Sequence, residues 1–270
     1  MAVAVTLQCS SEQKDRLVAE LIDSGTSGLI EEDLPGGQSL LRAFFEKPDA
    51  AQALAQRLSE YRPVTEPVEA QDWVGIERAQ WKPLLLGERF FLVPPWCNDP
   101  APSGRIRLEM PSGAAHGTGL HAPTQLMLMA LERYLQPRER VLDLGTGSGI
   151  LSVAAVRLGA GSVVACDIEE GAVRAAREYA GAWTPLFVGS VRSLRSASVD
   201  TIAANINAAT IAALALDIAR VLRPMGRALL SGFTAEDATR LARPLEAASL
   251  LVAGRMDRED WVCLVARSQI

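Results

Sequence analysis

The chain is poor in the residues that build metal and redox centres. Its 270 residues include only two histidines and four cysteines. The cysteines, Cys9, Cys97, Cys166 and Cys263, form no Cys-x-x-Cys pair, so neither a structural zinc site nor a redox-active pair is predicted. Cys166 and Cys263 lie in apolar runs, which is typical of buried free thiols. We therefore expect no metal and a reducing, cytoplasmic location.

Long apolar runs and an excess of positive charge are also missing. No run reaches the roughly eighteen apolar residues of a membrane-spanning helix, and residues 1–16 lack the basic and apolar regions of a secretion signal. Acidic residues outnumber basic ones, 32 to 27, for a net charge of −5. A general nucleic-acid binder usually carries a basic surface. We therefore expect a monomer with no membrane contact and no direct nucleic-acid binding, whose partner is a small molecule or a basic protein.

The first 61 residues predict a small N-terminal α/β domain of the ferredoxin-like type. Apolar periodicity indicates strand, helix, strand, strand and helix in that order, at 2–8, 11–23, 26–32, 38–45 and 48–60. Residues 62–111 are too rich in proline for regular helix. We interpret this segment as a linker that runs into a short hairpin formed by 89–93 and 104–109.

Residues 112–270 alternate between helices and strands. The expected elements are helix 122–135, strand 140–144, helix 149–158, strand 162–168, helix 169–180, strands 185–189 and 199–205, helix 208–222, strand 226–232, helix 235–247 and strands 250–257 and 260–267. This alternation predicts a doubly wound, mostly parallel sheet with helices on both faces. No helix separates the last two strands, so they should pair antiparallel. A terminal hairpin of this kind is typical of the Rossmann-like class I methyltransferases.

The sharpest signal is the glycine-rich turn after strand 140–144. Residues 143–149 read Asp-Leu-Gly-Thr-Gly-Ser-Gly. Gly145 and Gly147 allow backbone angles that a β-carbon would disfavour, and Asp143 lies at the carboxyl end of its strand, where open α/β sheets bind ligands. The dinucleotide-binding fingerprint would require glycine where this chain has Ile150. The turn therefore resembles methyltransferase motif I, which implies S-adenosylmethionine as cofactor.

Polar residues that end the later strands are further candidates. Asp167 can hold both ribose hydroxyls of a nucleoside, or it can cap the following helix. Asn205 ends strand 199–205, where class I enzymes place the residue that faces the departing methyl group. Asn207 is favoured as the cap of the next helix. Ser190 either touches the adenine or is a plain turn residue.

A family resemblance is carried by residues 116–124, which read His-Gly-Thr-Gly-Leu-His-Ala-Pro-Thr. This segment resembles the Phe-Gly-Thr-Gly-x-His-x-Thr-Thr segment of the PrmA family, whose members methylate large-subunit ribosomal protein eleven. The likeness covers most of the chain and is strongest from about 80 to 206. Further matching segments are 81–83, 95–96, 147–151, 158–160, 167–168 and 204–206.

The resemblance implies a protein methyltransferase whose N-terminal domain recognises the ribosomal protein and whose loop 116–121 closes over the cofactor. The chain departs from the family at His116, which replaces Phe, at Pro123, which replaces Thr, and at 178–183, a shortened form of an acid- and Asn-rich segment. Motif I and the resemblance together predict one catalytic residue, Asn205, and these cofactor-binding residues: Thr124, Asp143, Gly145, Thr146, Gly147, Asp167, Ile168, Ser190 and Asn205.

The expected reaction is methyl transfer to an amine, which must be neutral to attack. An N-terminal α-amine, with a pKa of about 8, is easier to deprotonate at neutral pH than a lysine near 10.4, by roughly 3 kcal/mol. Most of the rate should come from positioning, with the Asn205 carbonyl orienting the amine. Three alternatives stay open: a methyltransferase with another protein or a small molecule as acceptor, a nicotinamide-dependent oxidoreductase, and a non-catalytic cofactor-binding protein.

Overall fold

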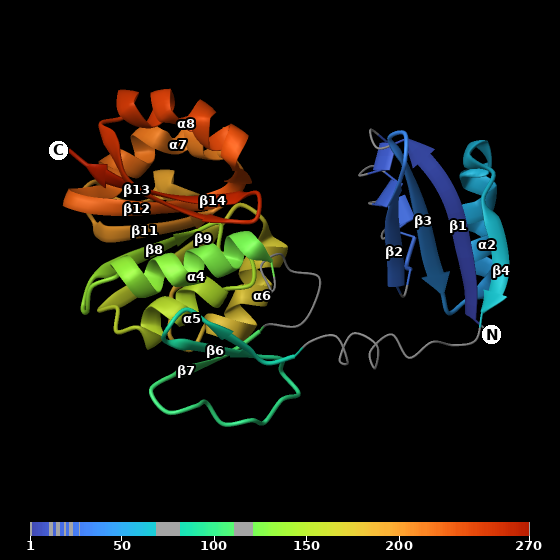
Figure 1. Cartoon of the computed structure of the whole chain (residues 1–270), viewed down its shortest axis with the longest axis horizontal. Coiled ribbons are helices and arrows are strands. Elements are labelled where there is room, and N and C mark those ends of the chain that lie inside the picture. The colour runs from blue at the N-terminus through green and yellow to red at the C-terminus, as the bar shows by residue number, and fades with distance from the viewer. Residues whose placement is uncertain are drawn as a thin grey trace. The chain divides into compact units, whose positions relative to one another are not determined.

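The computed structural model describes residues 2–10, 13–14, 17–18, 20–21, 24–26, 28–68, 82–110 and 121–269. Contacts divide the chain into two units, Met1–Gln80 and Trp81–Ile270 (Figure 1). Each unit is described below by itself. In the part of the chain that the structure describes, none of the helices is both long and apolar enough to cross a membrane.

The first unit is a four-stranded antiparallel sheet with helices on one face. Its strands are β1 (Ala2–Ser10), β2 (Gly28–Leu34), β3 (Gln38–Phe45) and β4 (Val64–Val68), in the order β2-β3-β1-β4. Helix α2 (Pro48–Arg57) and the short helix η1 (Ser59–Tyr61) follow β3. This strand order is that of a ferredoxin-like fold, as the sequence predicts.

Alternating residues of β1 and β3 build the core of this unit, because successive side chains of a strand point to opposite faces. On one face they pack against α2 and against Leu17 and Leu21, which are helical and fully buried. The helix expected at 11–23 otherwise falls partly outside the described residues. The strand and helix residues of this core are Val5, Leu7, Cys9, Leu41, Ala43, Phe45, Ala51 and Leu54.

Strand β4 corrects the prediction that residues 62–111 begin as a linker. Val64–Val68 pairs antiparallel with β1, with Ala4 opposite Glu66. Pro67 is compatible with this strand because β4 lies at the edge of the sheet, where one side of the backbone makes no ladder hydrogen bonds. A short strand that contains a proline and mostly exposed side chains has a weak sequence signal.

A second correction concerns the hairpin expected from 89–93 and 104–109. Strands β6 (Phe90–Val93) and β7 (Ile106–Glu109) do exist, but they pair in parallel. The antiparallel partner of β6 is β5 (Leu84–Leu86). The proline-rich connection between β6 and β7 is long enough to carry the chain back, so β7 can run in the same direction as β6.

This three-stranded sheet is part of the second unit and packs against two of its helices. Leu86, Phe90 and Leu108 are buried in one cluster with helices α4 (Ala122–Tyr134) and α5 (Ile150–Arg157). Glu132 of α4 accepts hydrogen bonds from the N–H groups of Glu88, at 2.8 Å, and Arg89, at 3.3 Å. The Tyr179 hydroxyl donates to the carbonyl of Glu109.

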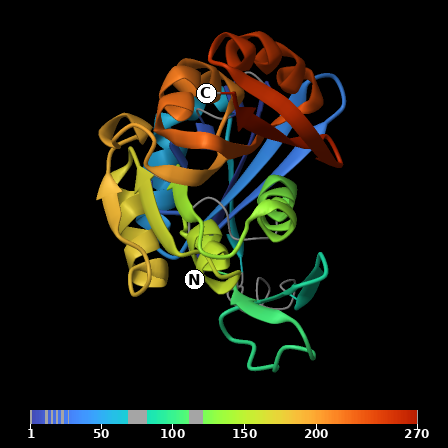
Figure 2. The same cartoon turned by 90° about the vertical axis from the view of Figure 1, so that its left-hand side faces the viewer.

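The second unit is built on a seven-stranded sheet in the order β10-β9-β8-β11-β12-β14-β13. The strands from β10 to β12 are parallel, and β14 inserts antiparallel between β12 and β13. The predicted doubly wound sheet with an antiparallel terminal hairpin is therefore confirmed. Figure 2 shows the hairpin and β10 at opposite edges of the sheet. The strands are β8 (Arg140–Leu144), β9 (Ser162–Asp167), β10 (Leu186–Val188), β11 (Val199–Asn205), β12 (Leu222–Thr234), β13 (Leu250–Arg258) and β14 (Trp261–Ser268).

Helices cover both faces of this sheet. Helices α4, α5 and α6 (Glu170–Ala180) pack on one face, and α7 (Ala208–Val221) and α8 (Ala235–Ala247) pack on the other (Figure 1). Most predicted bounds agree with the observed ones within about two residues, except that β12 begins at Leu222 rather than at 226. The short helix η2 (Val191–Ser193) follows β10. The carboxyl ends of five parallel strands thus meet along one edge of the sheet, where a ligand site is expected.

Candidate functional site

The glycine-rich turn after β8 has the conformation that its sequence predicts. Gly145, Gly147 and Gly149 have φ angles of 72°, 52° and 84°, in the left-handed region that L side chains rarely adopt. A β-carbon on Gly145 would lie 2.4 Å from Cγ2 of Ile206. The N–H groups of Gly145 and Thr146 donate to the carbonyl of Cys166, at 2.9 and 3.0 Å, which joins the turn to β9.

The buried Asp143 side chain is hydrogen-bonded to this turn and to the helix that follows it. Its Oδ2 accepts hydrogen bonds from the hydroxyls of Thr146, at 2.8 Å, and Ser152, at 2.6 Å, and the residue is only 1% exposed. Burial raises the pKa of its carboxyl to about 6, although both hydroxyls act in the opposite direction. Asp143 is not among the residues that line the pocket described below. The structure therefore places it behind the pocket wall.

Asp167 lies at the carboxyl end of β9 and lines the pocket. Its Oδ2 accepts from the N–H of Gly147 at 3.0 Å, and its Oδ1 accepts from the N–H of Glu169 at 3.1 Å. The N-cap position of α6 is occupied by Glu169. Asp167 is thus not the helix cap, and its carboxylate stands at the junction of the glycine-rich turn and β9.

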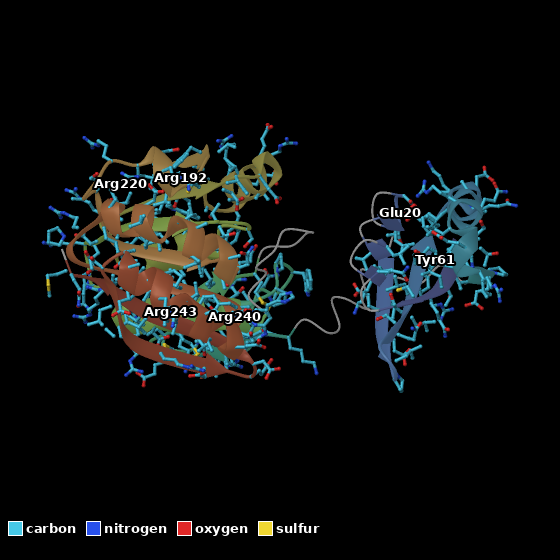
Figure 3. All side chains as sticks on the ribbon, turned by 90° about the horizontal axis from the view of Figure 1, so that it is seen from above. Glu20, Tyr61, Arg192, Arg220, Arg240 and Arg243 are labelled. Atoms are coloured by element: carbon cyan, nitrogen blue, oxygen red, sulfur yellow. The ribbon has the colours of Figure 1, made fainter. Side chains whose placement is uncertain are left out.

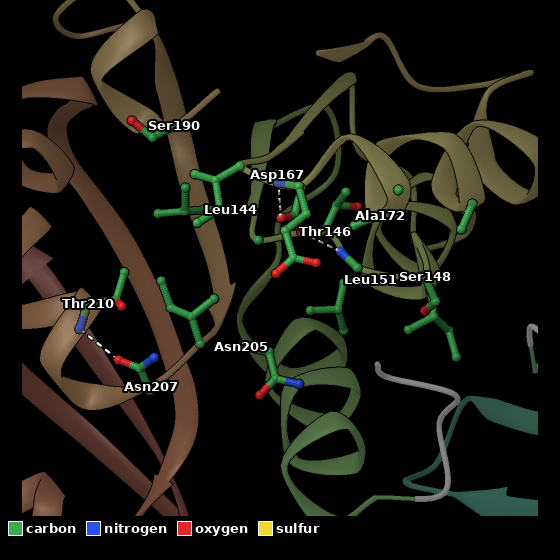
Figure 4. Close-up of a pocket in the computed structure, with 18 of the residues that line it drawn as sticks. Leu144, Thr146, Ser148, Leu151, Asp167, Ala172, Ser190, Asn205, Asn207 and Thr210 are labelled. Atoms are coloured by element: carbon green, nitrogen blue, oxygen red, sulfur yellow. Dashed lines mark hydrogen bonds between the residues drawn. The ribbon is translucent and has the colours of Figure 1, made fainter. Parts of the chain in front are cut away.

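These strand ends surround a pocket of about 680 Å³. Its walls come from the turns after β8, β9, β10 and β11 and from helices α4, α5, α6 and α7. Among the described residues, the charged ones that line it are Asp167 and Glu169, and no lysine or arginine does. The pocket therefore favours a ligand that carries positive charge. Figure 4 shows the residues that line it.

Asn205 and Asn207 have separate roles although they are neighbours in the sequence. The Asn205 amide donates to the hydroxyl of Thr124 on α4 at 3.3 Å, and its Oδ1 is buried with no hydrogen-bond partner among the residues that the structure describes. Asn207 Oδ1 instead accepts from the N–H of Thr210 at 2.8 Å and caps α7 (Figure 4). The prediction that Asn207 is the cap is confirmed, and Asn205 lines the pocket while its Oδ1 is buried.

Eight of the nine predicted cofactor-binding residues line this pocket; Asp143 is the exception. Ser190 both lines the pocket and accepts a hydrogen bond from the N–H of Arg192 at 3.3 Å, so it is also a turn residue. Ile168 is 77% exposed, so its apolar side chain is open to a ligand in the pocket. The eight are Thr124, Gly145, Thr146, Gly147, Asp167, Ile168, Ser190 and Asn205.

The structure adds pocket residues that the sequence analysis did not identify. Gly171, Ala172 and Ala175 line the pocket from one side of α6, where small side chains let a ligand approach the helix. Their spacing is a signal that could have been noticed, because residues three and four apart share a helix face. Thr210 and Leu214 line it from α7.

The segment that carried the family resemblance lies mostly outside the described residues. Of the loop expected to close over the cofactor, 116–121, only His121 is described, and it occupies the N-cap position of α4. In the described part of the chain, no three His, Cys, Asp or Glu side chains are grouped as a metal site would require.

Comparison with known proteins gives a consistent picture. The family model "Ribosomal protein L11 methyltransferase (PrmA)" matches residues 2–269. A ribosomal protein L11 methyltransferase of Symbiobacterium thermophilum is 38% identical over 202 residues, which are 74% of this chain and 66% of that protein. One from Listeria monocytogenes is 30% identical over 259 residues, which are 88% of this chain and 82% of that protein.

Solved structures agree with these sequence matches. The crystal structure of a ribosomal protein L11 methylase from Lactobacillus delbrueckii subsp. bulgaricus superposes with a TM-score of 0.63 and 28% identity. The superposition covers 70% of this chain and 98% of that one. The similarity therefore includes both the sequence and the fold.

Proposed function

Because the chain belongs to the ribosomal protein L11 methyltransferase (PrmA) family, we propose that it methylates amino groups of ribosomal protein L11 with S-adenosylmethionine as methyl donor. The observation that carries this proposal is the pocket at the carboxyl edge of the class I methyltransferase sheet. It combines a left-handed glycine turn, a carboxylate and an unpaired amide carbonyl.

The residues present fit this cofactor. S-adenosylmethionine supplies an electrophilic methyl group on a positively charged sulfonium, and the described residues of the pocket walls include two acids and no lysine or arginine. The carboxylate of Asp167 would accept hydrogen bonds from both ribose hydroxyls. The exposed side chain of Ile168 and the partly buried Ser190 would flank the adenine. The glycine-rich turn, together with Thr146, would hold the amino-acid part of the cofactor. Asp143 would act through Thr146 by fixing the orientation of its hydroxyl.

Asn205 would contact the amine that receives the methyl group. Its amide nitrogen is held by Thr124, so its Oδ1 has a fixed direction and no partner of its own. A buried carbonyl without a partner is costly, and an N–H of a neutral amine would satisfy it. The side chain would thereby orient the nitrogen lone pair toward the methyl carbon. The rate would come from this positioning and from exclusion of water.

The remaining parts of the proposal concern partners and place. The first unit would recognise ribosomal protein L11, and the chain would act as a monomer. The cytoplasm is the compartment that we propose, because all four cysteines are free and the proposed substrate is a component of the ribosome.

The test is transfer of labelled methyl groups from S-adenosylmethionine to purified ribosomal protein L11. Wild-type protein should label L11, and Asn205→Ala should lower kcat by about ten- to a hundredfold while the cofactor Kd stays within about twofold. Asn207→Ala is the matched control: it removes a helix cap worth about 1 kcal/mol of stability and should change kcat far less.

Each outcome has a separate meaning. Cofactor binding without label on L11 would favour another acceptor and leave the cofactor site intact. Absence of cofactor binding would overturn the whole proposal. Unchanged kcat in Asn205→Ala would remove this residue from the reacting centre.

A further inference from the structure

A second cavity lies at the opposite, amino edge of the parallel sheet. Its volume is about 590 Å³, and it is bounded by the starts of β8, β9 and β11 and by the loops that precede β10 and β11. Its polar side chains come from Arg140, Ser162, Trp183, Ser193 and Arg195, among others. None of these residues belongs to the cofactor pocket.

The walls of this cavity are positively charged. Arg140 and Arg195 line it, and none of the acidic residues that the structure describes does. Neither guanidinium has a hydrogen-bond or ion-pair partner among the described residues. The nearby Asp200 is already engaged, because it accepts from the backbone N–H of Arg140 at 2.9 Å and pairs with Arg223 at 3.3 Å. Two free guanidinium groups beside one cavity favour an anion that carries several oxygen acceptors, such as a phosphate.

Trp183 supplies an aromatic surface next to these arginines. It is 50% exposed, although large apolar side chains are more often buried. The guanidinium carbon of Arg157 lies 5.6 Å from the centroid of its ring. The half-exposed Trp183 side chain also lines the cavity, so part of its aromatic surface is open to a ligand there. Trp183 ends residues 178–183, the shortened segment in which the sequence departs from the family pattern.

We propose that this cavity binds a nucleotide, with its base stacked on Trp183 and its phosphate held by Arg140 and Arg195. Proteins that bind single-stranded nucleic acids without sequence preference combine aromatic side chains, which stack on the bases, with positively charged groups that contact the backbone. The expectation of no nucleic-acid binding rests on the net charge of −5, which assumes that charge is spread evenly over the chain. At this edge of the sheet the charge is locally positive. The ligand is either a free mononucleotide or a nucleotide within single-stranded RNA.

The experiment measures binding of uridine monophosphate and of oligouridylate to the full chain with the cofactor pocket saturated by S-adenosylhomocysteine. Uridine probes avoid adenine, which the cofactor pocket is proposed to accept. Saturable binding should quench tryptophan fluorescence, and Trp183→Phe should remove most of that quenching. The double variant R140Q/R195Q and the variant Trp183→Ala should each weaken binding about tenfold or more.

The matched control is R240Q/R243Q on α8, which removes the same number of charges from exposed arginines elsewhere on the unit (Figure 3). It should leave the nucleotide Kd unchanged. Unaltered affinity for S-adenosylhomocysteine in every variant shows that each one is folded. Tighter binding of oligouridylate than of the mononucleotide, lost in R140Q/R195Q, identifies RNA as the source of the nucleotide, and equal affinity identifies the free nucleotide.

Three results would overturn the proposal. The first is absence of saturable binding of either probe. The second is equal affinity in R140Q/R195Q and in the R240Q/R243Q control. The third is competition by polyglutamate as strong as that by oligouridylate, which would point to an acidic protein in place of a nucleotide.

Discussion

The two cavities at opposite ends of the same parallel strands are lined by opposite charge. At the carboxyl edge, the described pocket residues include Asp167 and Glu169 and no lysine or arginine. At the amino edge, the described cavity residues include Arg140 and Arg195 and no acid. The net charge of −5 averages these two regions and hides both. A ligand therefore meets a local charge that composition alone does not indicate.

The edges also differ in how their charged groups are held. Asp143 and Asp167 accept hydrogen bonds from the glycine-rich turn, and Asp143 also accepts one from Ser152 of α5. At the amino edge, outside the arginine cavity, Glu139 forms an ion pair with Arg227 that joins the start of β8 to β12. Asp167 thus faces a pocket, whereas Glu139 and Arg227 neutralise each other within the fold. Substitution of Asp167 should therefore affect cofactor binding, and substitution of Glu139 should affect stability.

The largest effect is expected for Asp167→Ala. If the Asp167 carboxylate accepts both ribose hydroxyls as proposed, its loss removes two charge-assisted hydrogen bonds, about 4 kcal/mol in total, and should weaken S-adenosylmethionine binding roughly a thousandfold. Calorimetric titration measures this change directly. Glu170→Ala on the exposed side of α6 is the control and should bind normally. Equal affinity of Asp167→Ala and wild type would contradict the claim that the carboxylate at the carboxyl edge binds the cofactor.

A smaller effect concerns Asp143 and depends on pH. Its folded-state pKa is raised to about 6 from an ordinary value of 3.8, so the folded state binds more protons than the unfolded state between these values. Stability should therefore fall as pH rises from about 4 to about 6 and then level off, with a total loss of about 3 kcal/mol.

Urea unfolding of wild type and Asp143→Asn across this range is the measurement. The amide does not titrate, so the stability of the variant should not fall in this way. The free energy of unfolding of the variant should therefore rise relative to that of the wild type as pH rises. A constant stability difference between the two proteins from pH 4 to pH 7 would contradict the account of Asp143 as a buried carboxyl that charges at a cost.

Sequence patterns predicted the carboxyl edge far better than the amino edge, and the reason is physical. The glycines at 145, 147 and 149 force one turn conformation, so the site around them is encoded within a few residues. The arginine cavity is assembled from separate loops, and no local pattern joins Arg140 to Trp183 or Arg195. The same limit applies to β6 and β7, since a strand's sequence does not reveal the direction of its partner.

Asp143 shows a different limit. It lies in a strand that is buried on both faces, as the buried Leu142 and Leu144 on either side of it show. Alternation of polar and apolar residues then gives no indication of which face is toward the ligand. The sequence places Asp143 at the correct end of the strand. It does not reveal whether the Asp143 side chain lines the pocket or lies behind the residues that do.

The smallest effect tests the amino edge through Glu139→Gln. Glu139 accepts from Arg227 at 2.7 Å and from the Thr201 hydroxyl at 2.8 Å, and the two paired side chains are only 15% and 13% exposed. The amide keeps one acceptor oxygen but loses the charge, so the free energy of unfolding should drop by about 1 to 2 kcal/mol. Glu236→Gln, whose ion pair with Arg240 is exposed, should cost less than about 0.5 kcal/mol. The cofactor Kd should be unchanged in both variants, because the charge of Glu139 is used within the fold; a Kd altered by Glu139→Gln would show that the two edges are coupled through β8.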